Sequence, residues 1–185
     1  GLDLARVKLD ELPAVRKAEL MHAFDDWVVD PALRLDALRR FTADRSRIAD
    51  PFAGRYVVWE SSGSSGEPGI FVQDAHAMAV YDALEYLRRP AARSLERLMN
   101  PWGLGQRFVF VGATGGHFAS TVSIERLRRL NPTLSLSLRS VSFLQSSEAL
   151  AAQLDALRPT VVATYPSVAL LLAEERLAGR LHAVP

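Results

Sequence analysis

The chain has 185 residues, of which 49% are hydrophobic and 23% charged, so it can bury the core of one domain. Its 22 lysines and arginines balance 21 aspartates and glutamates, which gives no reason to expect a nucleic-acid partner. The absence of cysteine excludes disulfides, thiolate catalysis and cysteine-ligated metals. No stretch approaches the roughly 20 apolar residues that cross a bilayer, and no signal peptide is evident, so we expect a cytoplasmic protein with no membrane partner.

Helical periodicity dominates the first 54 residues. Apolar residues recur at spacings of three and four over residues 20–28, which predicts an amphipathic helix. Asp30 followed by Pro31 is typical of a helix start, with aspartate as the N-cap and proline in the first helical position. The buried face of this second helix is expected to carry Leu35, Leu38 and Phe41.

Two short runs of β-branched and aromatic residues, 55–60 and 70–72, flank a loop rich in glycine and serine. Together they predict a β-hairpin with a long tip. Asp74 is then expected to cap a helix, and another helical piece is predicted over residues 93–99. The helix after Asp74 places its apolar residues on one face: Ala77, Val80, Tyr81, Leu84 and Leu87.

From residue 107 onward, predicted strands alternate with predicted helices. This alternation favours an α/β fold with a parallel sheet and crossover helices. The chain therefore divides into a helical N-terminal segment (1–54), a hairpin with further helices (55–105) and a βαβα sheet unit (106–185). Strands are expected at 107–111, 136–143 and 160–164, and helices near 122–130, from Ser147 and from Pro166 to Gly179.

The loop Ser61-Ser62-Gly63-Ser64-Ser65-Gly66-Glu67-Pro68-Gly69 has a composition suited to phosphate oxygens. Glycine permits positive φ and close approach of a ligand, while backbone N–H groups and hydroxyls can surround an anion. A solvated hairpin tip would explain the composition equally well. The loop is not a Walker A motif, because no lysine follows Gly66, and no G-x-S-x-G frame of a nucleophile elbow fits it.

The order of residues in this loop resembles the T-S-G-T-T-G-x-P signature of the adenylate-forming superfamily, which includes acyl-CoA synthetases, peptide-synthetase adenylation domains and luciferases. Serine replaces threonine at three positions and keeps every hydroxyl. Many members carry Lys-Gly after the proline, whereas this chain has Gly69-Ile70. The chain is most similar to the phenylacetate-CoA ligase-like branch, from about Leu12 to Gly179, on the strength of Leu12-Pro13, Lys17, Leu20 and Gly69-Ile70-Phe71.

The resemblance implies an ATP-dependent ligase that converts a small carboxylic acid into an acyl-AMP and then into a thioester with coenzyme A. It implies Mg²⁺ as well, although no histidine of the chain has metal-ligand spacing. The segments that contact adenine and ribose, and the C-terminal domain with its catalytic lysine, would lie beyond residue 185. The chain is then expected to be the N-terminal part of the large domain and inactive alone, with no catalytic residue assigned.

The resemblance also assigns binding residues. The β- and γ-phosphates of ATP would be held by Ser61, Ser62, Gly63, Ser64, Ser65, Gly66 and Glu67. The acyl substrate would lie beside Gly116, His117 and Phe118.

Two other functions remain open. The segment Gly112-Ala113-Thr114-Gly115-Gly116 follows a predicted strand and precedes a helix, the context of a dinucleotide-binding turn. Its spacing is G-x-x-G-G instead of G-x-G-x-x-G, and Arg139 stands in the next strand where an acidic residue would hold a ribose. A nicotinamide-dependent reductase is thus one alternative, and a non-catalytic interaction domain is the other.

Overall fold

The computed structural model describes residues 7–8, 12–61, 68–88 and 105–183. These form a mixed α/β structure with a small antiparallel sheet and a three-stranded parallel sheet, which confirms the expected α/β class. The elements in chain order are α1 (Lys17–His22), α2 (Phe24–Trp27), α3 (Leu35–Ala43), the 3-10 helix η2 (Arg45–Arg47), β1 (Val57–Glu60), β2 (Ile70–Gln73), α4 (Ala75–Arg88), β3 (Phe108–Gly112), α6 (Ala119–Leu130), α7 (Leu134–Ser137), β4 (Leu138–Ser142), α8 (Ser147–Leu157), β5 (Val161–Thr164) and α9 (Pro166–Leu177).

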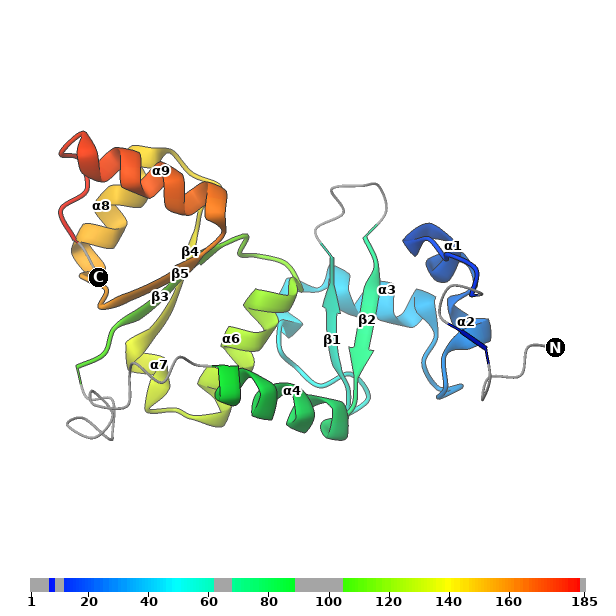
Figure 1. Ribbon diagram of the computed structural model, residues 1–185. Helices are drawn as coiled ribbons and strands as arrows, with labels where there is room; N and C mark the ends of the chain where they lie inside the picture. The colour runs from blue at the N-terminus through cyan, green and yellow to red at the C-terminus, as the bar shows by residue number, and fades with distance from the viewer. Residues whose placement is uncertain (1–6, 9–11, 62–67, 89–104, 184–185) are drawn as a thin grey trace.

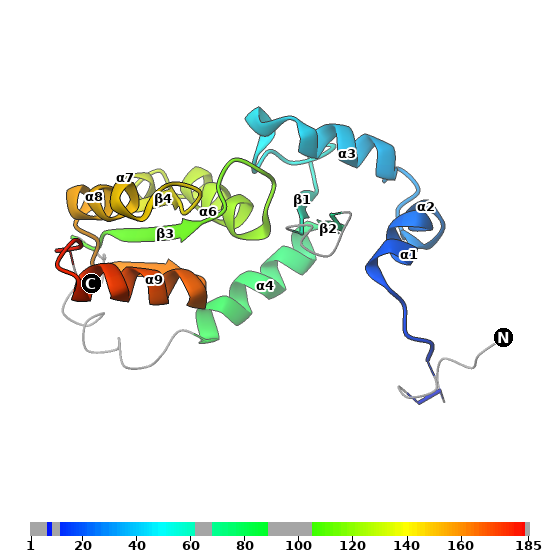
Figure 2. The same ribbon diagram turned by 90° about the horizontal axis from the view of Figure 1, so that it is seen from above.

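We call α1 to β2 the hairpin unit and β3 to α9 the sheet unit; they lie side by side in Figures 1 and 2. The sheet unit has strand order β4-β3-β5, all parallel, as the alternation predicted. In Figure 1, α8 and α9 lie above this sheet and α6 lies below it. The central strand β3 therefore carries helices on both faces, the arrangement of an open α/β sheet.

Side chains alternate across β3 because successive residues of a strand point to opposite faces. Val109 and Val111 face α8 and α9, where they form one core with Leu150, Leu154 and residues of α9. Phe110 faces the other way and packs with Ile124 of α6 and Leu138 of β4. Each face of the sheet thus has its own hydrophobic core.

The hairpin unit is built on strands β1 and β2, which pair antiparallel from Val57 opposite Gln73 to Glu60 opposite Ile70. This confirms the predicted hairpin. Helices α1 to α3 cover one side of the hairpin, and the shared core of this unit contains Met21, Phe24, Leu33, Leu38, Phe41, Tyr56, Val58 and Ile70.

The predicted helix start at Asp30 is wrong. The Asp30 carboxylate accepts a hydrogen bond from Ala32 N–H at 2.9 Å and also contacts Arg55 and Tyr56 of the hairpin, so it forms a turn. The helix begins five residues later at Leu35, whose N–H donates to the carboxylate of Asp25 at 2.9 Å. A carboxylate ten residues upstream therefore satisfies a backbone donor of the first turn.

Other boundaries also differ from expectation. Residues 20–28 form two short helices, α1 and α2, which meet at Ala23. The strand predicted over 136–143 is shorter, because residues 134–137 form the short helix α7. At the start of this helix, both the N–H and the hydroxyl of Ser135 donate to Pro132 O. The helix predicted near 122–130 begins earlier, at Ala119. The helix predicted from Ser147 is α8, and Ser146 is its N-cap, since the Ser146 hydroxyl accepts from Ala149 N–H.

The helix after Asp74 is confirmed, since the Asp74 carboxylate accepts from Ala77 N–H at 2.8 Å. Its apolar face is largely exposed to solvent among the side chains that the structure describes, however, and Met78 is buried. The exposed side chains of that face are Val80, Tyr81, Leu84 and Leu87. The helix predicted over 93–99 lies outside the described residues.

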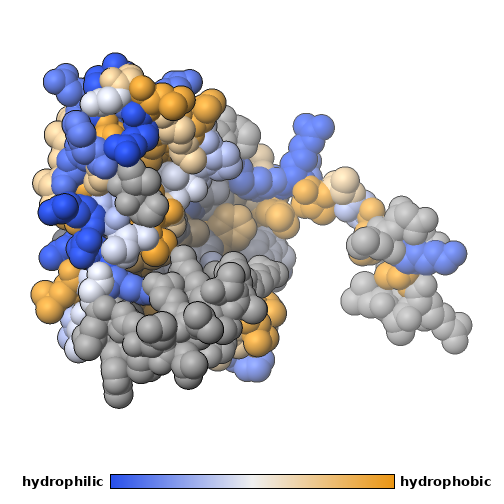
Figure 3. All heavy atoms as spheres, turned by 60° about the vertical axis from the view of Figure 1, so that its left-hand side comes forward, coloured by the Kyte–Doolittle hydropathy of each residue, from blue (hydrophilic) through white to orange (hydrophobic). Residues whose placement is uncertain are grey.

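The helix predicted from Pro166 is confirmed as α9, with proline in its first turn and Gly179 at φ +71 just beyond its end. Figure 3 shows the sheet unit from the left-hand side of Figure 1, and there hydrophilic and hydrophobic side chains are intermixed.

Candidate functional site

A cavity of about 590 Å³ opens between the hairpin, the C-terminal end of α3 and the turn that follows β3. Leu144, just beyond β4, also lines it, so the cavity lies outside the carboxyl ends of two parallel strands. Ligands of open α/β sheets bind at this edge. The residues that line it include Arg39, Arg45, Glu60, Pro68, Gly115, Gly116 and Phe118.

Ser61 and Gly69 close the base of the glycine–serine loop. Ser61 N–H donates to Gly69 O at 2.9 Å, and Gly69 N–H donates to the Ser61 hydroxyl oxygen at 2.9 Å. Glu60 and Pro68 lie beside these residues and line the cavity, so the base of the loop borders it. The other predicted phosphate-binding residues, Ser62, Gly63, Ser64, Ser65, Gly66 and Glu67, lie outside the described residues.

Gly69 allows α1 to approach the base of the loop. A Cβ at Gly69 would lie 3.0 Å from Cδ of Lys17, which is tighter than most real Cβ contacts. The alkyl stem of Lys17 therefore packs against the end of the loop. Lys17 is one of the residues on which the family resemblance depends, but no pattern in the sequence indicates its contact with Gly69.

The turn after β3 brings the second glycine cluster to the cavity. Thr121 of α6 donates its hydroxyl to Ala113 O at 2.8 Å and holds the turn against the helix. Gly115 has φ +91, a conformation that favours glycine. Gly116 is buried, and a Cβ there would lie 2.9 Å from the Phe118 ring. Thr114 to Gly116 and Phe118 then line the cavity.

His117 is placed differently from its neighbours. Its side chain is fully buried, and its ring lies 5.2 Å from the ring of Phe41, centroid to centroid. Neither ring nitrogen has a hydrogen-bond partner among the described residues. His117 O accepts from Glu60 N–H at 2.8 Å, which ties the turn after β3 to the end of β1. The residue joins the two units, and its ring does not line the cavity.

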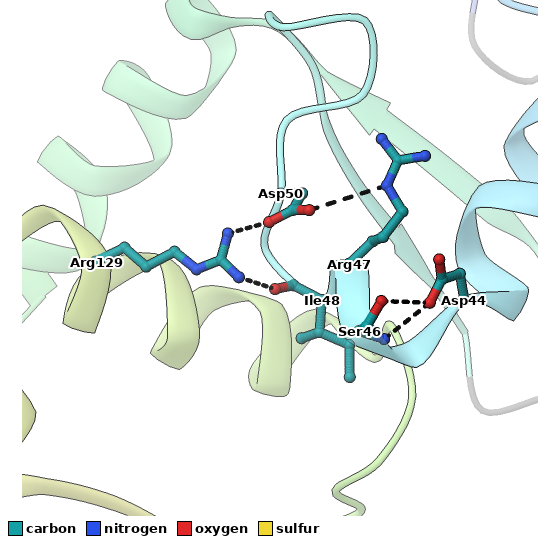
Figure 4. Close-up of polar contacts among 6 residues, drawn as sticks. All are labelled: Asp44, Ser46, Arg47, Ile48, Asp50 and Arg129. Carbon is teal, nitrogen blue, oxygen red and sulfur yellow. Dashed lines mark hydrogen bonds and ion pairs between the residues drawn. The ribbon is translucent and has the colours of Figure 1, made fainter.

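Polar contacts join α6 to the segment after α3 (Figure 4). Arg129 forms an ion pair with Asp50 and donates to Ile48 O at 2.9 Å. In the same segment, the carboxylate of Asp44 accepts from the hydroxyl of Ser46 at 2.6 Å and from its N–H at 3.0 Å. The hydrogen bond from the Ser46 hydroxyl is the main cause that lowers the pKa of Asp44.

Among the described residues, three charged side chains line the cavity: Arg39 at the end of α3, Arg45 in η2 and Glu60 at the end of β1. No sequence motif marks these residues as functional. Their convergence depends on how α3 packs on the hairpin, which local periodicity does not indicate.

No protein-family model matches the chain, and no curated protein matches it. Across the described ranges there is no group of three or more histidine, aspartate or glutamate residues that could hold a metal ion. Within the same ranges, no helix is both long enough and apolar enough to cross a membrane.

Proposed function

We propose that this chain is the part of an ATP-dependent acid ligase that binds the phosphates of ATP. The complete enzyme would join a carboxylic acid to AMP and transfer the acyl group to coenzyme A. The observation that supports this proposal is the cavity itself. There, the base of the glycine–serine loop, at Glu60 and Pro68, faces the turn of Gly115 and Gly116.

The residues around the cavity suit a phosphate-bearing ligand. Transfer of a phosphoryl or adenylyl group depends mainly on positioning and on stabilisation of negative charge. Arg39 and Arg45 supply positive charge at the wall, and Gly115 and Gly116 let the ligand approach the backbone. Glu60 is the residue that would hold Mg²⁺, since this ion is commonly bound by one or two carboxylates together with substrate phosphates.

Binding of ATP to the serine loop can be measured directly. We expect the chain to bind Mg·ATP in isothermal titration calorimetry, and we expect a variant with S62A, S64A and S65A to bind it about tenfold more weakly or worse. The control is S167A, an exposed serine on α9 far along the chain from the loop. Equal ATP affinity of the triple variant and S167A would contradict the phosphate assignment.

A nicotinamide-dependent reductase is the second candidate, because strand β3, a glycine turn and helix α6 follow one another as in dinucleotide-binding folds. The same titration with NADPH distinguishes the two. Saturable NADPH binding without ATP binding would support the reductase.

Catalysis by this chain alone is a separate question. We expect no exchange of pyrophosphate into ATP with aryl or fatty acids, because the family's adenine-binding and ribose-binding segments and its lysine are expected further along. Robust exchange would show that these 185 residues already hold a complete site, and would contradict the assignment of a partial domain.

A further inference from the structure

Arg45 differs from the arginines on either side of it. Arg40 forms an ion pair with Asp36 at 2.9 Å, and Arg47 pairs with Asp50 at 3.9 Å while its guanidinium lies 4.4 Å from the centre of the Phe41 ring. Within the described ranges, Arg45 has no ion pair of this kind. Its guanidinium instead belongs to the wall of the cavity.

The backbone opposite Arg45 fixes where this charge lies. The Nη1 atom of Arg45 is 4.0 Å from the position that a Cβ at Gly115 would occupy. Because Gly115 has no side chain, the guanidinium and the glycine turn border the same open space. A ligand there would meet a planar, permanently charged donor on one side and the backbone of residues 114–116 on the other.

The described carboxylates near Arg45 do not form an ion pair with it. Asp44 precedes Arg45 in the chain, but its carboxylate is held by the N–H and hydroxyl of Ser46. Among the described lining residues, Glu60 carries a negative charge, and it forms no ion pair with Arg45. An anion in the space beside Gly115 would therefore be attracted to Arg45.

We propose that Arg45, with Arg39 beside it, is the oxyanion subsite of this cavity, an inference that rests on the proposed function. The guanidinium forks match the two oxygens of a carboxylate or a phosphate and bind them in bidentate fashion. The bound oxyanion comes either from the acid substrate or from the nucleotide. Arg45 positions that group at the point where the loop base and the turn after β3 meet.

The test compares R45Q and R45K with R40Q, each titrated with phenylacetate and with inorganic pyrophosphate. R40Q is the matched control, because Arg40 is an exposed arginine of α3 that pairs with Asp36 and does not line the cavity. We expect R45Q to weaken one of the two probes about tenfold or more, and R45K to weaken it less. Weakening of phenylacetate assigns the subsite to the acid, and weakening of pyrophosphate assigns it to the nucleotide.

Thermal unfolding of each variant serves as the check on folding, and R45Q is expected to melt at the wild-type temperature because Arg45 is exposed. If both probes bind R45Q and R40Q equally well, or if neither binds the wild type, the oxyanion subsite is refuted. Titration with Mg·ATP separates this failure from that of the proposed function. If R45Q binds Mg·ATP, phenylacetate and pyrophosphate as tightly as the wild type does, the oxyanion subsite is refuted but the proposed ATP-binding function is not.

Discussion

The hairpin unit and the sheet unit each have a hydrophobic core, but the contacts that set the bounds of their elements span different distances in the sequence. The sheet unit repeats one local rule: residues of β3 alternate between the core under α8 and α9 and the core over α6. The hairpin unit depends on polar contacts between distant residues, such as Asp25 with Leu35 N–H and Ile70 N–H with the Met21 sulfur at 3.2 Å. The first pattern is visible in a short window of sequence, and the second is not.

The cavity lies where these two kinds of structure meet. Its wall takes Arg39 and Arg45 from the hairpin unit and Gly115 from the sheet unit. The contacts that join the two units include Glu60 N–H with His117 O, the Arg129–Asp50 ion pair and the packing of His117 on Phe41.

The largest effects are expected in the two cores. Leu154 of α8 and Leu38 of α3 are fully buried in separate cores, and L154A and L38A should each lower the free energy of unfolding by about 2–5 kcal/mol. We expect one unfolding transition in both variants, because buried His117 of the sheet unit packs on Phe41 of the hairpin unit. Calorimetry that resolves two transitions, each lowered by one variant only, would show that the units unfold separately.

Two glycine turns, one in each unit, give the next prediction. Gly115 and Gly54 both have positive φ, at +91 and +74, so G115A and G54A should each lower the free energy of unfolding by about 1–2 kcal/mol. Gly54 has open space around it, but a methyl group at Gly115 would lie 4.0 Å from Arg45. Calorimetric titration should then show weaker Mg·ATP binding to G115A only. Equal ATP binding by both variants would contradict the placement of the ligand at this turn.

The strands and helices of the sheet unit could be predicted because their determinants are local. Alternation in β3, Pro166 at the start of α9 and Gly179 after its end all act within a few residues. The start of α3 could not be predicted, because Asp25 accepts from Leu35 N–H across ten residues while Asp30 turns to Arg55 and Tyr56.

The candidate site divides in the same way. Its glycines are visible in the sequence, since a cluster such as Gly115-Gly116 after a β-branched strand indicates a turn that a ligand can approach. The charges at its wall are not visible, because Arg39 and Arg45 reach the cavity, and Arg45 reaches Gly115, only through the packing of α3 and η2. The resemblance implies that His117 lies beside the acyl substrate, and the burial of its ring could not be read from the sequence.

His117 provides a prediction at the boundary of the two units. Its ring nitrogens lack partners among the described residues, and leaving a buried polar group unsatisfied costs free energy. H117F keeps an aromatic ring against Phe41 and removes this cost, so we expect the free energy of unfolding to rise by about 1 kcal/mol in chemical denaturation. ATP affinity should stay unchanged. A loss of ATP binding in a stable H117F protein would instead give His117 a role at the ligand.

The ion pair of Arg129 with Asp50 crosses between the units at the surface. Both side chains are partly exposed, and exposed pairs contribute little, so R129Q should lower the free energy of unfolding by about 1 kcal/mol or less. R40Q breaks an exposed pair within one helix and should cost no more than R129Q. Urea denaturation of both variants checks the order. A larger loss from R40Q would show that the contact of Arg129 with residues 48–50 does not hold the units together.

The smallest effect is a pH dependence in the sheet unit. Glu175 of α9 is buried and accepts from Arg180 at 2.6 and 3.0 Å, and this contact is the main cause that lowers the pKa of Glu175 below its ordinary value of 4.5. The unfolded chain therefore binds a proton more readily than the native protein. The stability from this carboxylate is fully present above the unfolded pKa and is lost as the pH falls through the lower, folded pKa.

The variant E175Q cannot gain or lose that proton, so its stability should fall less than that of the wild type between about pH 6 and about pH 3. D36N is the control, because the pKa of Asp36 is also lowered but its side chain is largely exposed beside Arg40. Urea midpoints at both pH values give the comparison. If E175Q and the wild type lose equal stability, the acid sensitivity arises elsewhere. The next carboxylate to test is then Asp30 of the hairpin unit, whose pKa is lowered by its contacts with Tyr56 and Arg55.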